Sequence, residues 1–229
     1  IPTMKQRLAA PGVLVSLTGI AEMRGVCTGD GGLHIGAATP HAVVAKEAAR
    51  HYPALAALAG GIGDPSVRSR GTIGGSIANN DPAACYPSAV LASGATVVTN
   101  KRKIAADDYF QGLFTTALEE GEIITAIRFP IPKRAAYMKF KQAASRFSLV
   151  GVFVAQTDSG VRVAVTGAAS SVFRHARLEA ALNQSFTPQS AASVKIDASD
   201  LNADIHASAA YRANLISVMT QRAVAKALG

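Results

Sequence analysis

The chain has 229 residues, of which 49% are hydrophobic and only 17% are charged. Disordered chains are rich in charge and poor in apolar side chains, so this composition excludes intrinsic disorder and predicts one large domain or two small ones. Lysine and arginine number 23 against 15 aspartate and glutamate, but this charge of +8 is spread along the chain without interleaved aromatic residues, which disfavours nucleic-acid binding.

Short strands and helices alternate in the first sixty residues. A strand over 14–17 and a turn with a brief helix over 19–25 precede an alternating strand over 33–37. Thr39 and Pro40 are predicted as the N-cap and first residue of a helix that runs to about residue 51. A second helix is predicted over 53–59. Strands followed by helices are typical of α/β and α+β folds.

The composition changes at residues 60–76, where six of 17 residues are glycine and no helical or strand period is visible. Ordering glycine costs conformational entropy, so this stretch predicts a loop that turns tightly or approaches a ligand closely. Asp81 and Pro82 are then expected to cap a short helix that ends at Ala92. A strand over 95–99, a basic turn and irregular chain over 104–111 follow.

A proline-rich boundary divides the remainder of the chain. An acidic turn over 119–122 leads into a largely apolar strand over 123–129, which Pro130 and Pro132 stop. We therefore expect two domains, residues 1–132 and residues 133–229. The second is predicted to contain strands over 137–141, 149–156 and 161–167, then helices over 176–182, 188–194 and 207–228. The last helix carries an apolar stripe of Tyr211, Leu215, Val218, Met219, Ala223 and Leu228.

The sequence shows no membrane or secretion signal, and its cysteines suggest a reducing compartment. No apolar run is long enough for a transmembrane helix, and the first residues lack the pattern of a signal peptide. The chain begins at Ile1 without a methionine, which indicates a processed or trimmed product. Cys27 and Cys85 form no Cys-x-x-Cys motif, so we expect each to be a small buried hydrophobe in a cytoplasmic protein.

Familiar catalytic motifs are absent: the sequence has no HExxH, GxSxG or Walker A lysine motif, and its five histidines lack metal-ligand spacing. Catalysis would then belong to a cofactor that the protein positions. The segment Thr72-Ile73-Gly74-Gly75-Ser76 suits that role, because successive N–H groups in a glycine-rich turn can form an anion site that no Cβ blocks. By itself this motif is equally consistent with a plain loop.

Residues 62–84, with the sequence IGDPSVRSRGTIGGSIANNDPAA, closely resemble the flavin-binding subunits of the molybdenum hydroxylases. These are the medium subunit of aerobic carbon monoxide dehydrogenase and the middle domain of xanthine dehydrogenase. The resemblance covers nearly the whole chain: residues 1–8 are similar to the segment after the family's first flavin loop, and residues 121–130 to its strand before the domain boundary. Residues 208–212 and 221–223 are similar to its C-terminal helix.

The resemblance implies an α+β oxidoreductase subunit that binds FAD. Residues 1–132 would be a partial FAD-binding domain of the vanillyl-alcohol-oxidase/PCMH type, and residues 133–229 a small C-terminal domain of the CO dehydrogenase flavoprotein type. By this resemblance, a molybdenum cofactor on a large partner subunit oxidises the substrate. Electrons then pass through 2Fe-2S clusters on a small partner subunit to FAD and on to an acceptor, in a dimer of heterotrimers. This chain would contribute no catalytic residue and no metal ligand.

Residue by residue, the resemblance implies that the FAD pyrophosphate is held by the backbone N–H groups of Thr72, Ile73, Gly74, Gly75 and Ser76. Ile62 matches a position flanking the isoalloxazine ring, and Ile124 and Lys141 match positions at the ring or its edge. An ammonium group there would favour the anionic reduced flavin by Coulomb attraction. Core packing for Ile124 and a surface position for Lys141 remain open.

Two departures from the family pattern weaken the expected cofactor site. Cys85 stands where many members place an acidic residue that bonds the ribityl chain. A second phosphate loop of A-G-G-x-S-L type, which the family places directly before the segment that begins at Ile1, is not in the sequence. At ~1.5–3 kcal/mol for each charge-assisted hydrogen bond, its loss would cost several kcal/mol. We therefore expect this chain to bind FAD weakly or not at all.

Three other interpretations stay open. Cys85 and the absent loop would also suit a non-catalytic interaction subunit with a vestigial flavin site. A flavin oxidase of the vanillyl-alcohol type shares the FAD fold, but no histidine for covalent flavin attachment can be assigned here. Nucleic-acid binding would require an affinity that depends strongly on salt.

Overall fold

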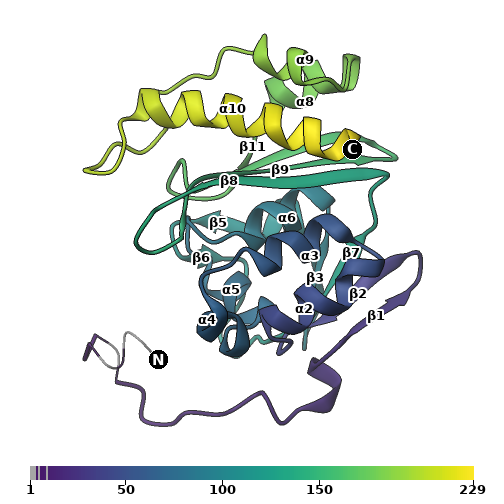
Figure 1. Ribbon diagram of the computed structural model, residues 1–229. Coiled ribbons are helices and arrows are strands. Elements are labelled where there is room, and N and C mark those ends of the chain that lie inside the picture. Colours follow the sequence, from purple (N-terminus) through teal and green to yellow (C-terminus); the bar gives the residue numbers. More distant parts are fainter. Residues whose placement is uncertain (1–3, 5, 9) are drawn as a thin grey trace.

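The computed structural model describes Met4, residues 6–8 and residues 10–229 (Figure 1). The similarity over residues 1–8 therefore falls partly outside the described residues. Two antiparallel sheets dominate the fold, with helices between them and further helices over the outer face of the second sheet (Figure 1). This arrangement is the α+β fold that the sequence predicts.

The first sheet has five strands and is built around the buried side chains of Leu33, Ile35, Val97, Ile127 and Phe129. Its first hairpin turns at Asp30 and Gly31, both with positive φ, which matches the two-residue type I′ turn that Asp-Gly favours. In spatial order its strands are β1 (Val26–Gly29), β2 (Gly32–Gly36), β7 (Ile124–Pro130), β3 (Thr96–Thr99) and β4 (Lys103–Ala105).

Short helices follow β2 and cover this sheet. Proline or a side-chain cap fixes the start of several of them, as where Asp64 accepts a hydrogen bond from Val67 N at 2.9 Å. They are α2 (His41–Glu47), η2 (Ala48–Arg50), α3 (Pro53–Gly60), α4 (Pro65–Arg70), α5 (Ile73–Asn79), α6 (Tyr86–Ser93) and α7 (Ala106–Tyr109), with a small hairpin of β5 (Phe110–Gly112) and β6 (Thr115–Thr116). One further short helix, η1 (Ala21–Met23), precedes β1.

The second sheet is central, so helices cover both of its faces. α10 packs on β8 and β9, while α3 and α6 pack on the opposite face, and β9 is therefore buried along eight consecutive residues. The elements are β11 (Phe173–Arg174), β10 (Gly160–Thr166), β9 (Ser148–Thr157) and β8 (Arg134–Lys141) in spatial order, and the helices α8 (Ala176–Gln184), α9 (Pro188–Ala192) and α10 (Ala209–Leu228).

Tyr52 of the first half packs edge-on against both Phe129 of β7 and Phe153 of β9, with ring centroids 6.3 Å apart in each pair. Phe153, Ala155 and other residues of the second sheet thus belong to the same apolar cluster as the first sheet. A second cluster lies between the second sheet and α8, α9 and α10. The division into domains at residue 132 stays a prediction.

Several expected elements are wrong. Residues 14–17 form no strand, and residues 60–76 contain α4 and the first part of α5 instead of a continuous loop. Residues 104–111 are ordered as β4, α7 and β5, and the helix expected after Asp81 starts only at Tyr86. Asp81 instead accepts a hydrogen bond from Ala83 N at 2.8 Å and stabilises a turn.

The N-cap of α2 and the buried face of α10 also differ from the prediction. Pro40, not Thr39, is the N-cap of α2, because the Thr39 hydroxyl is hydrogen-bonded to both the N–H and the carbonyl of Gly25. In α10 the ends of the predicted stripe, Tyr211 and Leu228, are exposed. The helix instead buries Arg212, Ile216, Thr220 and Val224 together with Leu215, Met219 and Ala223.

Candidate functional site

The amino end of α5 carries the glycine-rich motif. Thr72 caps the helix by accepting a hydrogen bond from Gly75 N at 3.1 Å. A Cβ on Gly74 would lie 2.5 Å from the Ala37 Cβ and 2.7 Å from the Ala37 carbonyl oxygen, so this glycine lets α5 rest directly on the end of β2. Gly75 is exposed, and a Cβ added to it would meet only the Thr72 hydroxyl, at 3.0 Å. Gly75 therefore leaves the outer surface of the turn bare.

The backbone donors of this turn already have acceptors inside the protein. Ile73 N donates to Thr39 O and Gly74 N to Ala37 O, while Gly75 N and Ser76 N donate to Thr72. A phosphate group would take the Gly75 N–H only by displacing the Thr72 hydroxyl from it. The hydroxyl groups of Thr72 and Ser76 are the donors that need no such exchange.

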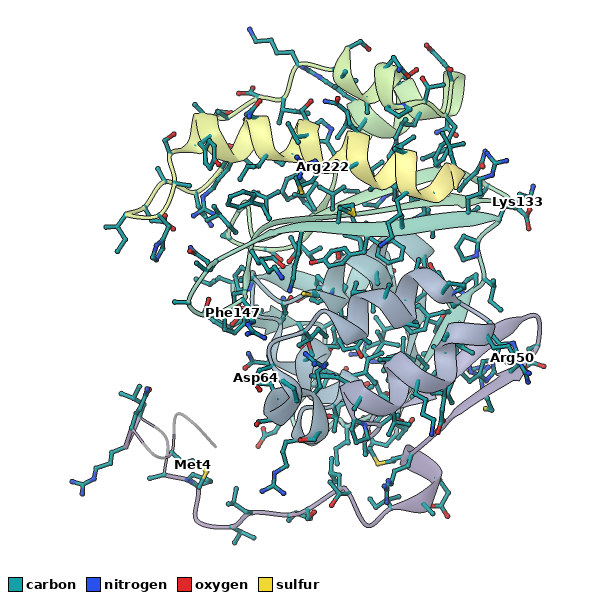
Figure 2. The ribbon with its side chains drawn as sticks, viewed as in Figure 1. Met4, Arg50, Asp64, Lys133, Phe147 and Arg222 are labelled. Atoms are coloured by element: carbon teal, nitrogen blue, oxygen red, sulfur yellow. The ribbon has the colours of Figure 1, made fainter. Side chains whose placement is uncertain are left out.

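Two cavities flank α5, and six of the eight predicted site residues line them. The first, of about 240 Å³, contains Thr72, Gly74, Gly75 and Ile124. The second, of about 230 Å³, contains Ile62 and Ser76 together with residues of α2, β8 and the loop between β8 and β9. Figure 2 shows Phe147, which lines this second cavity, on the same edge of the molecule as Asp64 at the start of α4.

The two remaining predicted residues lie elsewhere. Ile73 is fully buried in the core, and Lys141 is exposed at the end of β8, outside both cavities. Lys139 reaches the second cavity instead, where its Nζ donates to Gly61 O at 2.9 Å and to Arg146 O at 3.0 Å. Sequence reasoning missed Lys139, although strand alternation places it on the same face as the buried Tyr137.

Cys85 also lines the second cavity, where Lys139 Nζ lies 3.4 Å from its sulfur. Ser148 Oγ is 3.5 Å from the same sulfur and 2.9 Å from the Tyr137 hydroxyl. Burial, followed by the nearby Cys85 thiol, raises the pKa of Tyr137 well above its ordinary value, so this hydroxyl stays neutral. Cys85 is buried as expected, but Cys27 is exposed on β1, so that expectation is wrong.

His41 is a cavity residue that the sequence analysis missed. It is 5% exposed, and its Nδ1 atom has no hydrogen-bond partner among the described residues. Burial, with a contribution from the Arg68 charge, lowers its pKa from 6.5 to about 4, so the imidazole is neutral at pH 7. The neighbouring Tyr86 hydroxyl also lacks a partner within the part of the chain that the structure describes. Buried polar atoms are rarely left unpaired, so Nδ1 suits a ligand atom.

A network of hydrogen bonds and an ion pair around Glu122 stabilises the rim of the first cavity. The buried side chain of Glu122 accepts hydrogen bonds from Thr99 Oγ1 at 2.7 Å, from Arg102 at 3.1 Å and from Glu119 N at 2.8 Å. The Arg102 bond, then those from Thr99 and Glu119, lower the Glu122 pKa from 4.5 to about 2. Glu122 thereby ties the start of β7, and with it Ile124, to the β3–β4 hairpin.

The donor set around α5 fits the FAD that the resemblance implies. Hydroxyl groups and a bare glycine surface suit phosphate oxygens, and the Lys139 ammonium suits a carbonyl oxygen. Ile62 and Ile124 offer apolar contacts for an aromatic ring system. The His41 side chain, whose Nδ1 has no partner among the described residues, adds one polar group on the side of Ile62.

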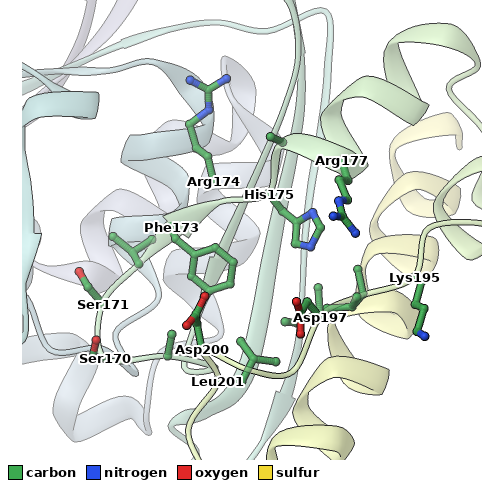
Figure 3. A pocket seen from close by; sticks show the side chains of 15 residues that line it. Ser170, Ser171, Phe173, Arg174, His175, Arg177, Lys195, Asp197, Asp200 and Leu201 are labelled. Carbon is green, nitrogen blue, oxygen red and sulfur yellow. The ribbon is translucent and has the colours of Figure 1, made fainter.

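A larger cavity, of about 530 Å³, lies between β11, the start of α8 and residues 195–201. Figure 3 shows Phe173, His175, Arg177, Lys195 and Asp197 around it. It contains none of the predicted site residues. Cavity size alone does not identify the flavin site, and the motif at α5 outweighs it.

Across the part of the chain that the structure describes, no helix is both long and apolar enough to cross a membrane. The same residues contain no cluster of three or more histidine, cysteine, aspartate or glutamate side chains that could hold a metal ion.

Comparison with known proteins gives consistent results. Residues 1–132 match the family model described as the FAD binding domain in molybdopterin dehydrogenase. The nicotine 6-hydroxylase medium subunit of Paenarthrobacter nicotinovorans is 33% identical over 99% of this chain and 86% of its own length.

Two solved structures share the fold. Carbon monoxide dehydrogenase from Hydrogenophaga pseudoflava, in a form that lacks the Mo-pyranopterin moiety of the molybdenum cofactor, matches with a TM-score of 0.87 and 31% identity. Quinoline 2-oxidoreductase from Pseudomonas putida 86 matches with a TM-score of 0.89 and 26% identity. Each match covers 99% of this chain and 85% of the other.

Proposed function

We propose a flavin site from the premise that this chain belongs to the family of FAD-binding domains in molybdopterin dehydrogenases. The chain is thus an FAD-binding oxidoreductase subunit of the molybdenum hydroxylase type. FAD lies across the amino end of α5, with its pyrophosphate beside residues 72–76. The observation that carries this placement is the bare surface at Gly75, set between two cavities that contain most of the predicted residues.

The residues of this chain bind and orient the cofactor. Bound FAD supplies the electron-carrying chemistry. Thr72 and Ser76 donate hydroxyl hydrogen bonds to phosphate oxygens, and Ile62 and Ile124 exclude water from the apolar parts of the cofactor. Lys139, fixed by two carbonyl groups, takes the position at the flavin that the resemblance implied for Lys141. Its charge favours anionic character on the reduced ring.

The partners belong to the same proposal. The similar nicotine 6-hydroxylase chain is named a medium subunit, and the similar carbon monoxide dehydrogenase is named with a molybdenum cofactor. We infer that a large subunit with that cofactor and a small subunit with 2Fe-2S clusters accompany this chain, as a dimer of heterotrimers that passes electrons to FAD here. The free Cys27 and Cys85 suit a reducing cytoplasmic compartment.

A titration with FAD, followed by quenching of flavin fluorescence, tests the site. We expect weak but saturable binding to the 229-residue chain. A Gly75→Asp variant places a carboxylate on the bare surface, so its repulsion of the phosphates should raise Kd at least about tenfold, or ~1.4 kcal/mol. Gln189→Asp, at the exposed start of α9, is the matched control and should leave Kd unchanged.

The same titration has two outcomes that count against the proposed site. Equal Kd values for Gly75→Asp and the parent chain would contradict the placement at α5. No saturable binding up to millimolar FAD would contradict the proposal that residues 72–76 and the two cavities are sufficient for a flavin site.

A further inference from the structure

Cys85 occupies an unusual place for a cysteine of a reducing compartment. Its sulfur lines the cavity beside α5 and is held between two polar groups, Lys139 Nζ at 3.4 Å and Ser148 Oγ at 3.5 Å. A cysteine that serves only as a small hydrophobe is surrounded by apolar side chains. Cys85 instead has an ammonium group as its neighbour, which can offset negative charge on the sulfur.

The surroundings of the sulfur favour a small anionic molecule. Among the cavity's lining residues, Lys139 and Arg146 are cationic and Asp81 is anionic. The Arg68 guanidinium, bonded to the carbonyl groups of Ile62 and Gly63, adds a positive charge at the rim.

Independent evidence that the cavity takes a ligand comes from His41, a nearly fully buried lining residue whose Nδ1 atom has no hydrogen-bond partner among the described residues. Space is available as well. A neighbouring cavity of about 490 Å³ shares Asp81, Ala83, Ser145 and Phe147 with this one, so the two adjoin. A reagent larger than the first cavity can therefore extend into the second.

We propose that Cys85 is a thiol-modification site for small anionic disulfides. The Cys85 sulfur, as thiolate, attacks one sulfur of the disulfide; the new S–S bond forms to Cys85 as the old one breaks. The other half leaves as a thiolate, which takes up a proton from solvent to replace the one that Cys85 released. Lys139 pairs with the attacking thiolate. Because the adduct fills the cavity beside Ile62, it excludes the flavin, and this last point rests on the proposed function.

Single-cysteine variants of the 229-residue chain test this assignment. Cys27→Ser leaves only Cys85, and Cys85→Ser leaves only the exposed Cys27 as a reference. Each folded variant is incubated with glutathione disulfide, which is anionic, or with cystamine, which is cationic, and intact mass is followed over time. We expect one dithiothreitol-reversible glutathionyl adduct on Cys27→Ser. For each variant, the rate of modification by glutathione disulfide is divided by the rate with cystamine. This ratio should be about tenfold higher for Cys27→Ser than for Cys85→Ser.

A second pair of variants tests the role of Lys139. Adding Lys139→Met to Cys27→Ser should slow adduct formation about tenfold, whereas Lys139→Arg, which keeps the charge, should restore most of the rate. Circular dichroism confirms that each variant is folded. The proposal would be overturned if Cys85 in Cys27→Ser reacted only in denaturant and not in the folded protein. Equal rates for the Lys139→Met and Lys139→Arg variants would also overturn it.

Added FAD distinguishes this proposal from the flavin placement. At FAD concentrations that saturate the fluorescence titration, adduct formation on Cys27→Ser should slow at least about tenfold, because the occupied fraction of the cavity is closed to the disulfide. An adduct that forms at the same rate with and without bound FAD supports the modification site and contradicts the flavin position beside Cys85.

Discussion

Gly74 and Gly75 are adjacent in the sequence but serve different purposes. Gly74 is buried where α5 meets Ala37, and its missing side chain is required by packing. Gly75 faces outward, where a Cβ would meet only a hydroxyl group. The motif alone does not separate these roles, because both residues look like parts of one phosphate turn. The packing partner of Gly74, Ala37, directly follows β2 and lies more than thirty residues earlier in the chain.

A Gly74→Ala substitution should therefore destabilise the fold. The added Cβ overlaps Ala37 backbone and side-chain atoms that cannot move easily, and such overpacking costs about 1–3 kcal/mol. Gly75→Ala is the matched control, and its gain in helix propensity of up to about 1 kcal/mol offsets the close contact with Thr72. Urea unfolding followed by circular dichroism measures both. If the two variants unfold at the same midpoint, the packing role of Gly74 is wrong.

Lys139 and Lys141 show that the sequence of one strand does not by itself identify which lysine reaches the cavity. The family resemblance implied Lys141, while the fold brings Lys139 against Gly61 and Arg146 in the cavity. The pairing of β8 with β9 shifts between Phe140 and Lys141, which changes how residues project at this strand end. Such an irregularity depends on the partner strand and is invisible in the sequence of β8 alone.

Elements with strong periodicity were predicted well from the sequence. The strands expected over 33–37, 95–99 and 123–129 and the three helices of the C-terminal part all exist, within a few residues of their expected ends. The predictions were wrong where local signals competed. In residues 60–76 the glycines suggested a loop, but the caps Asp64 and Thr72 were sufficient for two short helices.

The network around Glu122 gives a pH-dependent contribution at the junction of β7 with the β3–β4 hairpin. Its folded pKa of about 2 lies below the ordinary 4.5, so the carboxylate stabilises the fold above pH 4.5. This contribution is lost as the pH falls from about 4.5 through about 2. We expect Glu122→Gln to unfold at lower urea than the parent chain at pH 7, with the gap closing toward pH 2.

The control for this measurement is Glu120→Gln, which removes an exposed carboxylate from the same turn and should change the urea midpoint little at any pH. A gap for Glu122→Gln that stays constant between pH 7 and pH 2 would show that the Glu122 charge does not stabilise the junction.

At the scale of the whole molecule, the sequence resemblance was confirmed. The family match, the similar medium subunit and the solved structures all agree with the expected α+β flavoprotein subunit. The assembly of the site was beyond the sequence, because it joins residues that are far apart. Lys139 meets Gly61 and Cys85 across 78 and 54 positions, through the packing of the second sheet on α3 and α6.

The central claim is that FAD lies across α5 between the two cavities. The most direct test is the amide chemical-shift map of the isotope-labelled chain during titration with FAD. We predict that the largest shifts fall on residues 72–76, Ile62, Ile124 and Lys139, while the 530 Å³ cavity between β11 and α8 stays unchanged. Shifts centred on Phe173, His175 and Arg177, with none at residues 72–76, would contradict the account.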